Sequence, residues 1–588
     1  MATRGHKPHR SRRYVLLLAA FIAVMAAIGG RLIYLQAVAG PAYAQMAHEQ
    51  RNQEMDVPAR RGSIYDREGE PLAVSMEARD VYAVSRSVVD KQAAASAVAG
   101  VLGGRAQEYL SKLNKDAPFV YLARKVDVER ADTLKKLDLA GIGFQEDARR
   151  VYPSNELACQ VLGFVGIDDV GLSGIEKYYD TVLAGTPGKV IAEKGPHGIP
   201  IPGGVTLQED AIDGENIVLT IDKDIQYQAH VELQAAVEKW GAKGGSVLVM
   251  EPKTGAILAM ASTPSFDPNA FSTADQKAFR NRPIVDTYEP GSTIKSLTAA
   301  AVIEEKLFTP ASMFVLPSTL NVGGRTIHES HPRGQVTWSL TDIVTNSSNV
   351  GAVKLGIALG EEGLYSYFSR FGLTEKTGVD FPGEASGWLP PPSQWSASSI
   401  GNIPFGQGVS VTPLQLARAL GAIANGGELV TPHFLQALPD SPDKTLLWPK
   451  KRAISEETAA EMRSVLKAVV TEGTGSGAHV TGYTVAGKTG TAQKARTDGV
   501  AGYAKGKYVG SFSGFVPADD PAVLIIVTID EPSGSIYGGT IAAPTFSRLA
   551  AYCMQHLKIP PTSATRGSIE ASKAAGGPVT DESQSAGE

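Results

Sequence analysis

Ser292 and Lys295 are the residues of this chain whose types and spacing most directly suggest chemistry. They follow a Glu-Pro-Gly sequence at 289–291, and a run of helix-forming residues occupies 297–303. The Pro-Gly pair ends the preceding element, so Ser292 is expected at a helix start. Residues three apart share a helix face, so the hydroxyl and the amine can meet. Burial and the helix dipole would both lower the pKa of this amine, which makes Lys295 a candidate base and Ser292 a candidate nucleophile.

An alternative role for Ser292 is helix capping, because serine favours the N-cap position. A capping box, however, has Glu or Gln three residues after the cap, whereas this chain has Lys295. A cation is also unfavourable near the positive end of a helix dipole. The lysine therefore argues against a simple cap, but this stretch alone leaves both interpretations open.

Other matches to the Ser-x-x-Lys pattern lack this local context. Ser441 and Lys444 lie in a proline-rich loop with no helix to align them. Ser464 and Lys467 lie in the middle of a predicted helix, where the hydroxyl is not presented at a helix start. Only Ser292 combines a chain-breaking Pro-Gly pair, a helix start and a lysine one turn later.

Ser347-Ser-Asn349 is a second short motif with polar side chains that could act on a substrate. Clusters of small polar residues between apolar stretches are more often turns or helix caps. Taken alone, this motif favours that structural interpretation.

The third motif is Lys488-Thr-Gly-Thr491, within a β-like run. A strand here would place Lys488 and Gly490 on one face, and Gly490 would let a substrate backbone approach closely. Two other Lys-Thr-Gly matches, at 253–255 and 376–378, fall in a hairpin turn and in a loop. In this order, and each on a suitable local structure, the three motifs together indicate one catalytic site.

The composition narrows the classes of protein. The 588 residues are 43% hydrophobic and 20% charged, with a net charge of −5 that argues against nucleic-acid binding. Cys159 and Cys553 lie in apolar, helix-like contexts and are expected to be two buried thiols. A disulfide between them is the alternative. The sequence has no Cys/His cluster with zinc spacing and no glycine-rich phosphate loop, so we expect no metal and no cofactor.

The N-terminus predicts a membrane anchor. Residues 1–13 contain five Lys or Arg and no acid, and residues 14–35 are apolar apart from Arg31, which can snorkel near the outer end. Positive charge before the span places the N-terminus in the cytoplasm and the rest of the chain outside. A cleaved signal peptide is the alternative, because 37–39 resembles a cleavage site, but the apolar run is longer than is usual there.

The remaining chain predicts a mixed α and β protein. We expect a polar helix over 41–56, a surface hairpin around 66–69, and a disordered Ser/Ala/Gly/Pro-rich tail over 558–588. From residue 217 onward, strands are expected at 217–222, 483–491, 508–516 and 522–529, a hairpin at 246–261, and helices at 223–240, 456–470 and 543–557.

The motifs together resemble those of a class B penicillin-binding protein, a membrane-anchored peptidoglycan D,D-transpeptidase, from the anchor to about residue 557. The resemblance includes 61–69 (Arg-Gly-Ser-Ile-Tyr-Asp-Arg-Glu-Gly), which is similar to the pedestal motif of the family, and also 72–73, 171–176, 289–292 and 406–408. No glycosyltransferase domain precedes the pedestal, unlike in class A proteins, and no PASTA repeats are visible. The stretch 163–169 is similar to the septal, cell-division branch.

The resemblance implies an α+β multidomain fold. It has an N-terminal transmembrane helix, an elongated β-rich pedestal domain, and a C-terminal α/β penicilloyl-serine transferase domain of the transpeptidase and β-lactamase type. The expected segments are a cytoplasmic basic tail (1–13), the anchor (14–35), the pedestal (41–215), the transpeptidase domain (216–557) and the disordered tail (558–588).

The resemblance also implies residue roles. Ser292 would be the nucleophile and Lys295 the general base, with Ser347, Asn349 and Lys488 completing the catalytic set. Thr489, Gly490 and Thr491 would bind the substrate.

The implied partners are peptidoglycan stem peptides on lipid II-derived glycan strands, β-lactams, a multi-span lipid II polymerase and divisome membrane proteins. The implied location is the inner membrane, with one span and an extracytoplasmic catalytic domain.

Three other functions are alternatives to the transpeptidase. The first is a serine β-lactamase, for which no deacylation base is evident, and the second is a β-lactam sensor, for which no signalling module is evident. The third is a catalytically silent division scaffold.

Overall fold

The structure, a computed structural model, describes residues 10–43, 46, 52–115, 117, 119–194, 200–496 and 502–562. The chain divides into two compact units, Met1–Arg60 with Gly185–Gly214, and Arg61–Ala184 with Glu215–Glu588. Most of the predicted disordered tail, and residues 1–9 of the predicted basic tail, lie outside the described residues.

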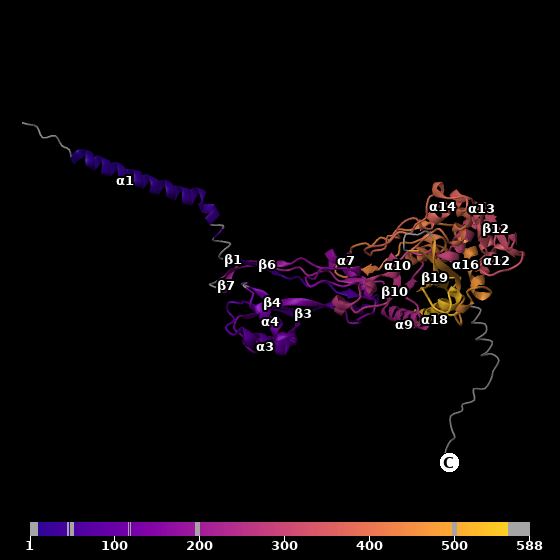
Figure 1. The fold of residues 1–588 in the computed structure, drawn as a ribbon, viewed down its shortest axis with the longest axis horizontal. Helices are drawn as coiled ribbons and strands as arrows, with labels where there is room; N and C mark the ends of the chain where they lie inside the picture. Colours follow the sequence, from indigo (N-terminus) through magenta and orange to yellow (C-terminus); the bar gives the residue numbers. More distant parts are fainter. Residues whose placement is uncertain are drawn as a thin grey trace, which may run out of the picture. The chain divides into compact units, whose positions relative to one another are not determined.

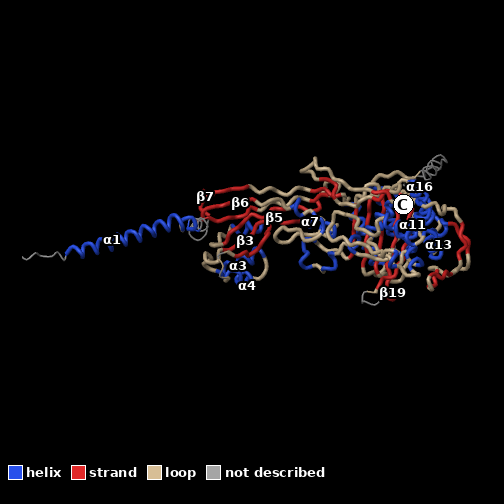
Figure 2. Tube along the Cα trace, turned by 90° about the horizontal axis from the view of Figure 1, so that it is seen from above, coloured by secondary structure: helices blue, strands red, loops and turns tan. Residues whose placement is uncertain are grey.

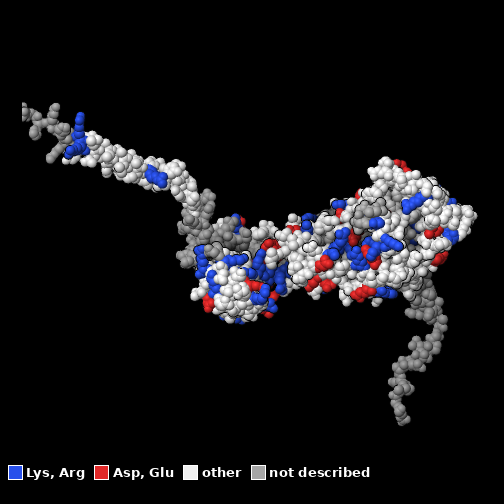
Figure 3. Space-filling model, in the orientation of Figure 1, with Lys and Arg blue, Asp and Glu red and all other residues white. Residues whose placement is uncertain are grey.

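The first unit contains the predicted membrane helix. Helix α1 spans Arg10–Ile33 and continues as the π-helical turn η1, Tyr34–Val38. The stretch Arg12–Val38 is long and apolar enough to cross a membrane. Figure 3 shows Lys and Arg colouring only near the start of this helix and at one later position, consistent with Arg12, Arg13 and Arg31.

The first unit also contains a three-stranded antiparallel sheet, in the order β1-β6-β7. Its strands are β1 (Asn52–Val57), β6 (Gly188–Lys194) and β7 (Pro200–Glu209). The expectation of a helix over 41–56 is therefore wrong for 52–56. The pairing of β1 with β6, more than 130 residues later, replaces the local helical preference.

The second unit begins with a sheet built around the long strand β3, Pro71–Ala83. β3 pairs with β4 (Val120–Asp127) and β5 (Ile142–Val151), and through β2 (Ile64–Tyr65) with β8 (Ile217–Leu219) and β16 (Leu435–Ala437). Helices α3 (Lys91–Leu102) and α4 (Ala106–Leu113) lie beside it (Figure 1), and α5 (Val128–Lys135) packs against the same sheet. Their apolar side chains form a small core with Val81 and Leu122.

The hairpin of β2 and β3 is present as predicted, but its base is buried rather than on the surface. Arg61 donates to Glu176 Oε2 at 2.6 Å, and Arg150 donates to Glu176 Oε1 at 2.6 Å. The Glu176 side chain is 0% exposed. Glu176 lies in α7 (Gly174–Tyr178), Arg150 lies in β5, and Arg61 lies just before β2. The Glu176 carboxylate therefore joins three segments that are far apart in sequence.

The rest of the second unit is organised by a five-stranded antiparallel sheet in the order β10-β9-β20-β19-β18. The strands are β9 (Gly244–Met250), β10 (Ile257–Thr263), β18 (Ala486–Ala495), β19 (Tyr503–Val516) and β20 (Val523–Asp530). These strands confirm the runs predicted at 246–261, 483–491, 508–516 and 522–529. β18 lies at one edge of the sheet.

Both faces of this sheet are covered. Val247 and Val249 belong to the core under α9 (Lys223–Lys239) and α18 (Ala543–His556), which lie together in Figure 1. Leu248 and Met250 belong to the core on the opposite face, with α15 (Pro413–Ala424) and α16 (Glu456–Thr471). Because alternate residues face opposite sides of a strand, burial on both faces explains the continuous apolar runs in the sequence.

The helical layer on that opposite face positions the candidate site (Figure 2). It contains η5 (Gly291–Ile294), α11 (Lys295–Glu304), α12 (Leu340–Thr345), α13 (Asn349–Leu359) and α14 (Glu361–Arg370). Two hairpins accompany it, β11 (Met313–Leu316) with β14 (Val336–Ser339) and β12 (Thr319–Val322) with β13 (Arg325–His328).

Shorter elements complete the unit. They are α6 (Cys159–Leu162), α8 (Asp180–Leu183), η3 (Pro268–Thr273), η4 (Gln276–Phe279), α10 (Arg282–Val285), η6 (Pro392–Gln394), η7 (Ser399–Gly401), η8 (Ile403–Phe405), β15 (Glu428–Leu429), β17 (Lys451–Arg452), η9 (Ser476–Ala478) and α17 (Gly538–Ile541). Cys159 and Cys553 are both buried free thiols.

Candidate active site

The candidate nucleophile lies in a short 3₁₀ turn. η5 spans Gly291–Ile294, and the α-helix begins at Lys295, three residues later than the sequence predicts. A 3₁₀ turn has three residues per turn, so Ser292 and Lys295 still lie one above the other. Ser292 is half-buried and lines a cavity, whereas Lys295 is 1% exposed.

The η5 turn is held by the loop at 406–408. The backbone N–H of Gly291 donates to the carbonyl of Gly406 at 3.2 Å. Gly406 has a φ of +87°, and a Cβ there would come within 2.1 Å of the Gly291 carbonyl oxygen. The carboxylate of Glu289 accepts hydrogen bonds from the backbone N–H of Gly408 and from the Tyr503 hydroxyl, both at 2.9 Å. These contacts give the Gly406-Gln-Gly408 motif a structural role.

The Lys295 amine points to the Ser-Ser-Asn turn. Its Nζ lies 2.6 Å from the Ser347 carbonyl oxygen, 3.2 Å from Ser347 Oγ and 2.7 Å from Asn349 Oδ1. Among the described hydrogen bonds, none joins Lys295 Nζ to Ser292 Oγ, and such catalytic contacts often form only with substrate bound. Burial lowers the pKa of Lys295 well below its usual value, and the charge of Lys488 lowers it further.

Ser347 sits in a strained turn between two helices. It has a φ of +58°, which is uncommon for a residue other than glycine. The next residue, Ser348, is the N-cap of α13 and accepts from the Gly351 N–H at 2.9 Å. Backbone strain of this kind persists where surrounding contacts enforce it and often marks functional sites. The capping interpretation is therefore correct for Ser348, and the turn presents Ser347 and Asn349 to Lys295.

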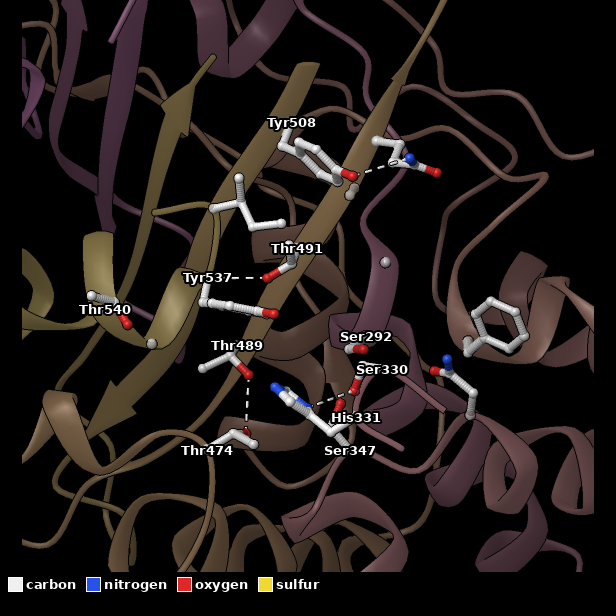
Figure 4. A pocket seen from close by; sticks show the side chains of 18 of the residues that line it. Ser292, Ser330, His331, Ser347, Thr474, Thr489, Thr491, Tyr508, Tyr537 and Thr540 are labelled. Atoms are coloured by element: carbon white, nitrogen blue, oxygen red, sulfur yellow. Dashed lines mark hydrogen bonds between the residues drawn. The ribbon is translucent and has the colours of Figure 1, made fainter. Parts of the chain in front are cut away.

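Strand β18 contributes residues from both of its faces. Lys488 is 0% exposed, and burial lowers its pKa to about 7. Thr489 and Thr491 lie on the opposite face and line the cavity. Thr489 Oγ1 lies 3.0 Å from Thr474 Oγ1, and Thr491 Oγ1 accepts from the Gly538 N–H at 3.3 Å (Figure 4).

Gly490 faces the interior with Lys488 and is not among the residues that line the cavity. A Cβ at this position would come within 2.4 Å of Ser511 Oγ, 2.9 Å of Thr293 Oγ1 and 3.0 Å of the Pro290 carbonyl oxygen. The glycine therefore allows close packing of β18 against the η5 turn. On the side where a Cβ would point, Gly490 therefore packs against protein atoms.

The cavity has a volume of about 600 Å³. Ser292 and Ser347 lie on its helical side, and Thr489 and Thr491 lie on the strand opposite (Figure 4). Further lining residues that the sequence motifs did not predict are Ser330, His331, Thr474, Tyr508 and Tyr537. The rings of His331 and Tyr537 stack with centroids 5.5 Å apart. No short motif marks these positions, because they come from separate loops and strands.

This arrangement suits nucleophilic acyl transfer. A serine hydroxyl opens to a cavity, and two fully buried lysines with lowered pKa values lie beneath it. A lysine with a lowered pKa can be neutral near pH 7 and can accept a proton from a nucleophile. The lining of the cavity adds further hydrogen-bonding groups, namely the hydroxyls of Thr489 and Thr491 and the Asn349 side chain.

Two protein families match the sequence. Residues 245–551 match the penicillin binding protein transpeptidase domain. Residues 56–219 match the penicillin-binding protein dimerisation domain.

Similar curated proteins align along nearly the whole chain. Stage V sporulation protein D of Bacillus subtilis is 36% identical over 561 residues, covering 94% of this chain and 86% of the relative. Peptidoglycan D,D-transpeptidase FtsI of Escherichia coli is 32% identical over 584 residues, covering 96% and 97%.

Solved structures agree with these matches. Penicillin binding protein 3 from Mycobacterium tuberculosis, complexed with ampicillin, is 32% identical, with a TM-score of 0.70 over 87% of this chain and 98% of that one. The aztreonam complex of the same protein gives a TM-score of 0.69. These likenesses confirm the predicted α+β fold with a transpeptidase domain, and the chain belongs to the class B penicillin-binding proteins.

Proposed function

We propose that this chain is a peptidoglycan D,D-transpeptidase that cross-links stem peptides through an acyl-enzyme on Ser292, in septal cell-wall synthesis. The observation that supports this most strongly is the environment of Lys295. Its amine is fully buried and contacts both Ser347 and Asn349, and Lys295 itself lies one turn after Ser292, which lines the cavity.

In acylation, Ser292 Oγ attacks the carbonyl carbon of the penultimate D-Ala of a D-Ala-D-Ala stem peptide. Neutral Lys295 accepts the hydroxyl proton, which its lowered pKa permits. Ser347 Oγ, 3.2 Å from Lys295 Nζ, then passes its hydroxyl proton to the departing D-Ala nitrogen and takes up the proton that Lys295 holds, so both side chains end neutral. The peptide bond breaks, D-Ala leaves, and an ester to Ser292 remains.

The oxyanion of the tetrahedral intermediate would lie between the backbone N–H groups of Ser292 and Thr491. The Thr491 carbonyl oxygen lies 3.1 Å from where a Cβ on Gly291 would be, so the polar backbone groups of Thr491 face the η5 turn. The N–H and C=O of one residue point to the same side of a strand. Two such donors would stabilise the transition state by about 3 kcal/mol or more.

The two threonines of β18 would bind the terminal carboxylate of the stem peptide. Thr489 and Thr491 both line the cavity, and the neighbouring Thr474 and Gly538 orient their hydroxyls. Lys488, buried beneath them, supplies positive potential when protonated. An amine from a second stem peptide then attacks the ester and restores Ser292. A β-lactam acylates the same Ser292 oxygen, and the resulting ester is hydrolysed only slowly.

The location and partners follow from the anchor and from the family. The single apolar helix fits a single-pass membrane protein. The arginines before the span support a cytoplasmic N-terminus and an extracytoplasmic catalytic domain. A multi-span lipid II polymerase and divisome membrane proteins are the proposed partners of the anchor and pedestal.

The proposed nucleophile and base can be tested with intact-protein mass spectrometry after incubation of the full chain with benzylpenicillin at pH 7. The wild type should gain the mass of one stable penicilloyl group, and Ser292→Ala should gain none. Lys295→Ala should lose labelling, because no neutral amine accepts the serine proton. Labelling of Lys295→Ala at the wild-type rate would refute its role as base. Rapid hydrolysis of the drug would instead indicate a β-lactamase.

The septal assignment has its own test. Depletion of a septal transpeptidase blocks division but not elongation, so depleted cells should become filaments. Round cells after depletion would instead indicate a role in elongation.

A further inference from the structure

Glu329 lies directly after β13, at the back of the Ser-Ser-Asn turn. Its side chain is 6% exposed. Oε1 accepts a hydrogen bond from Ser348 Oγ at 2.6 Å, and Oε2 accepts one from the Asn349 backbone N–H at 2.6 Å. Arg333 completes the contacts through an ion pair with Oε1. Both carboxylate oxygens are thus occupied by donors, two of which belong to the turn.

We propose that Glu329 is a positioning residue for catalysis, which holds the Ser347–Asn349 turn in place and, through it, holds and electrostatically tunes Lys295. This inference rests on the proposed function of Lys295 as base. Glu329 itself does not line the cavity, so it is not expected to touch the substrate.

The geometry of Asn349 carries the effect from Glu329 to Lys295. The Asn349 backbone N–H is bound by Glu329, and its Nδ2 donates to the His328 carbonyl oxygen at 2.9 Å. The same amide then presents Oδ1 to Lys295 Nζ at 2.7 Å. Two anchors from residues 328–329 therefore determine where the oxygen that accepts from the lysine lies.

The charges around Lys295 give Glu329 a second effect. Burial and the positive charge of Lys488, on β18, lower the pKa of Lys295, whereas the negative charge of Glu329 raises it. Arg333 faces Glu329 from the same loop and is held there by cation–π contact with Trp338 at 4.7 Å. Glu329 thus partly offsets two influences that favour the neutral amine.

Three substitutions separate position from charge. Glu329→Gln removes the charge and replaces one accepting oxygen with an amide NH₂, which cannot accept from the turn. Glu329→Asp keeps the charge but shortens the side chain by one methylene. Arg333→Gln removes the cation that opposes Glu329. The exposed Glu362, on α14, provides the matched control Glu362→Gln.

The measurement is the second-order rate of benzylpenicillin acylation of the full chain, recorded from pH 5 to pH 9. For Glu329→Gln, the plateau rate should fall about tenfold or more, because the turn and Asn349 lose their anchor. The midpoint of the rising limb should also move to lower pH by about half a unit or more, because loss of the negative charge favours neutral Lys295. Arg333→Gln should move the midpoint to higher pH.

Glu329→Asp should keep the wild-type midpoint while recovering only part of the plateau rate. Glu362→Gln should match the wild type in both quantities. A loss of rate in Glu329→Gln with no change of midpoint, or midpoint shifts of the same sign in Glu329→Gln and Arg333→Gln, would overturn the inference. Absence of labelling in the wild type would instead overturn the proposed function, so the two failures are distinguishable.

Discussion

Replacement of Lys488 by methionine should stabilise the protein while it inactivates the site. Lys488 is 0% exposed, and the hydrogen bonds that its Nζ makes within the described part of the chain are two long ones to Thr489, at 3.2 Å and 3.4 Å. Burial lowers its pKa to about 7. Methionine has a similar length and carries no charge, so Lys488→Met removes the unfavourable burial and leaves the packing largely intact.

The size of the effect follows from proton linkage. The unfolded chain has a lysine pKa of about 10.4, so unfolding takes up a proton between about pH 7 and pH 10. Stability therefore rises with pH in this window. The shift of the Lys488 pKa from about 10.4 in the unfolded chain to about 7 in the folded protein lowers the free energy of unfolding by about 4 kcal/mol at pH 7. At pH 9 the same shift lowers it by about 2 kcal/mol. The free energy of unfolding of Lys488→Met should exceed that of the wild type by these amounts. At low pH the difference should be larger still, because Lys488 also lowers the pKa of Lys295.

Denaturant unfolding of the full chain in detergent, followed by tryptophan fluorescence, measures this difference. All five tryptophans lie between positions 240 and 448, within the same unit as Lys488. The variant's advantage should shrink by about half from pH 7 to pH 9. The half-exposed Lys467 on α16, which forms an ion pair with Asp519 at 3.8 Å, provides the control Lys467→Met, for which the difference from wild type should not change between the two pH values.

An advantage of Lys488→Met that is equal at pH 7 and pH 9 would refute the reasoning, because it would arise from packing rather than from a proton. A variant less stable than the wild type at pH 7 would refute it as well.

Three further substitutions test other parts of the structure. Glu176→Gln should lower the free energy of unfolding by about 3 kcal/mol, because the buried Arg61 and Arg150 lose the carboxylate that they share, although Arg61 keeps its pair with Asp180. Glu70→Gln, at an exposed pair, should cost under about 1 kcal/mol in the same denaturation assay. Gly490→Ala should slow penicillin acylation about tenfold, because the added Cβ displaces the η5 turn; Gly334→Ala, which meets no atom within 4 Å, should leave the rate unchanged. Ser348→Ala should cost about 1 kcal/mol of stability through loss of the α13 cap, and an unchanged denaturation midpoint would contradict that cap.

Local sequence patterns were enough to predict much of the fold. The continuous apolar runs at 246–250 and 523–529 predicted strands because both faces of the central sheet are covered, and β9 and β20 confirm them. The prediction failed for 52–56, where pairing with β6 determines the conformation. It also placed the base of the hairpin at 66–69 on the surface, because the two segments that bury Arg61 lie about 90 and 115 residues away in sequence.

Sequence alone brought together the residue types and the order of the candidate site. The placement of Lys295 one turn after Ser292 depends only on local helical geometry, which a motif can encode. The contact of Lys295 with Asn349 spans 54 residues, and that of Asn349 with Glu329 spans 20. Such distances depend on how α11, α13 and the β13 loop pack. The tertiary structure therefore decided which groups surround the lysine, how deeply it is buried, and that Gly490 packs against protein, because each of these depends on contacts between segments far apart in the chain.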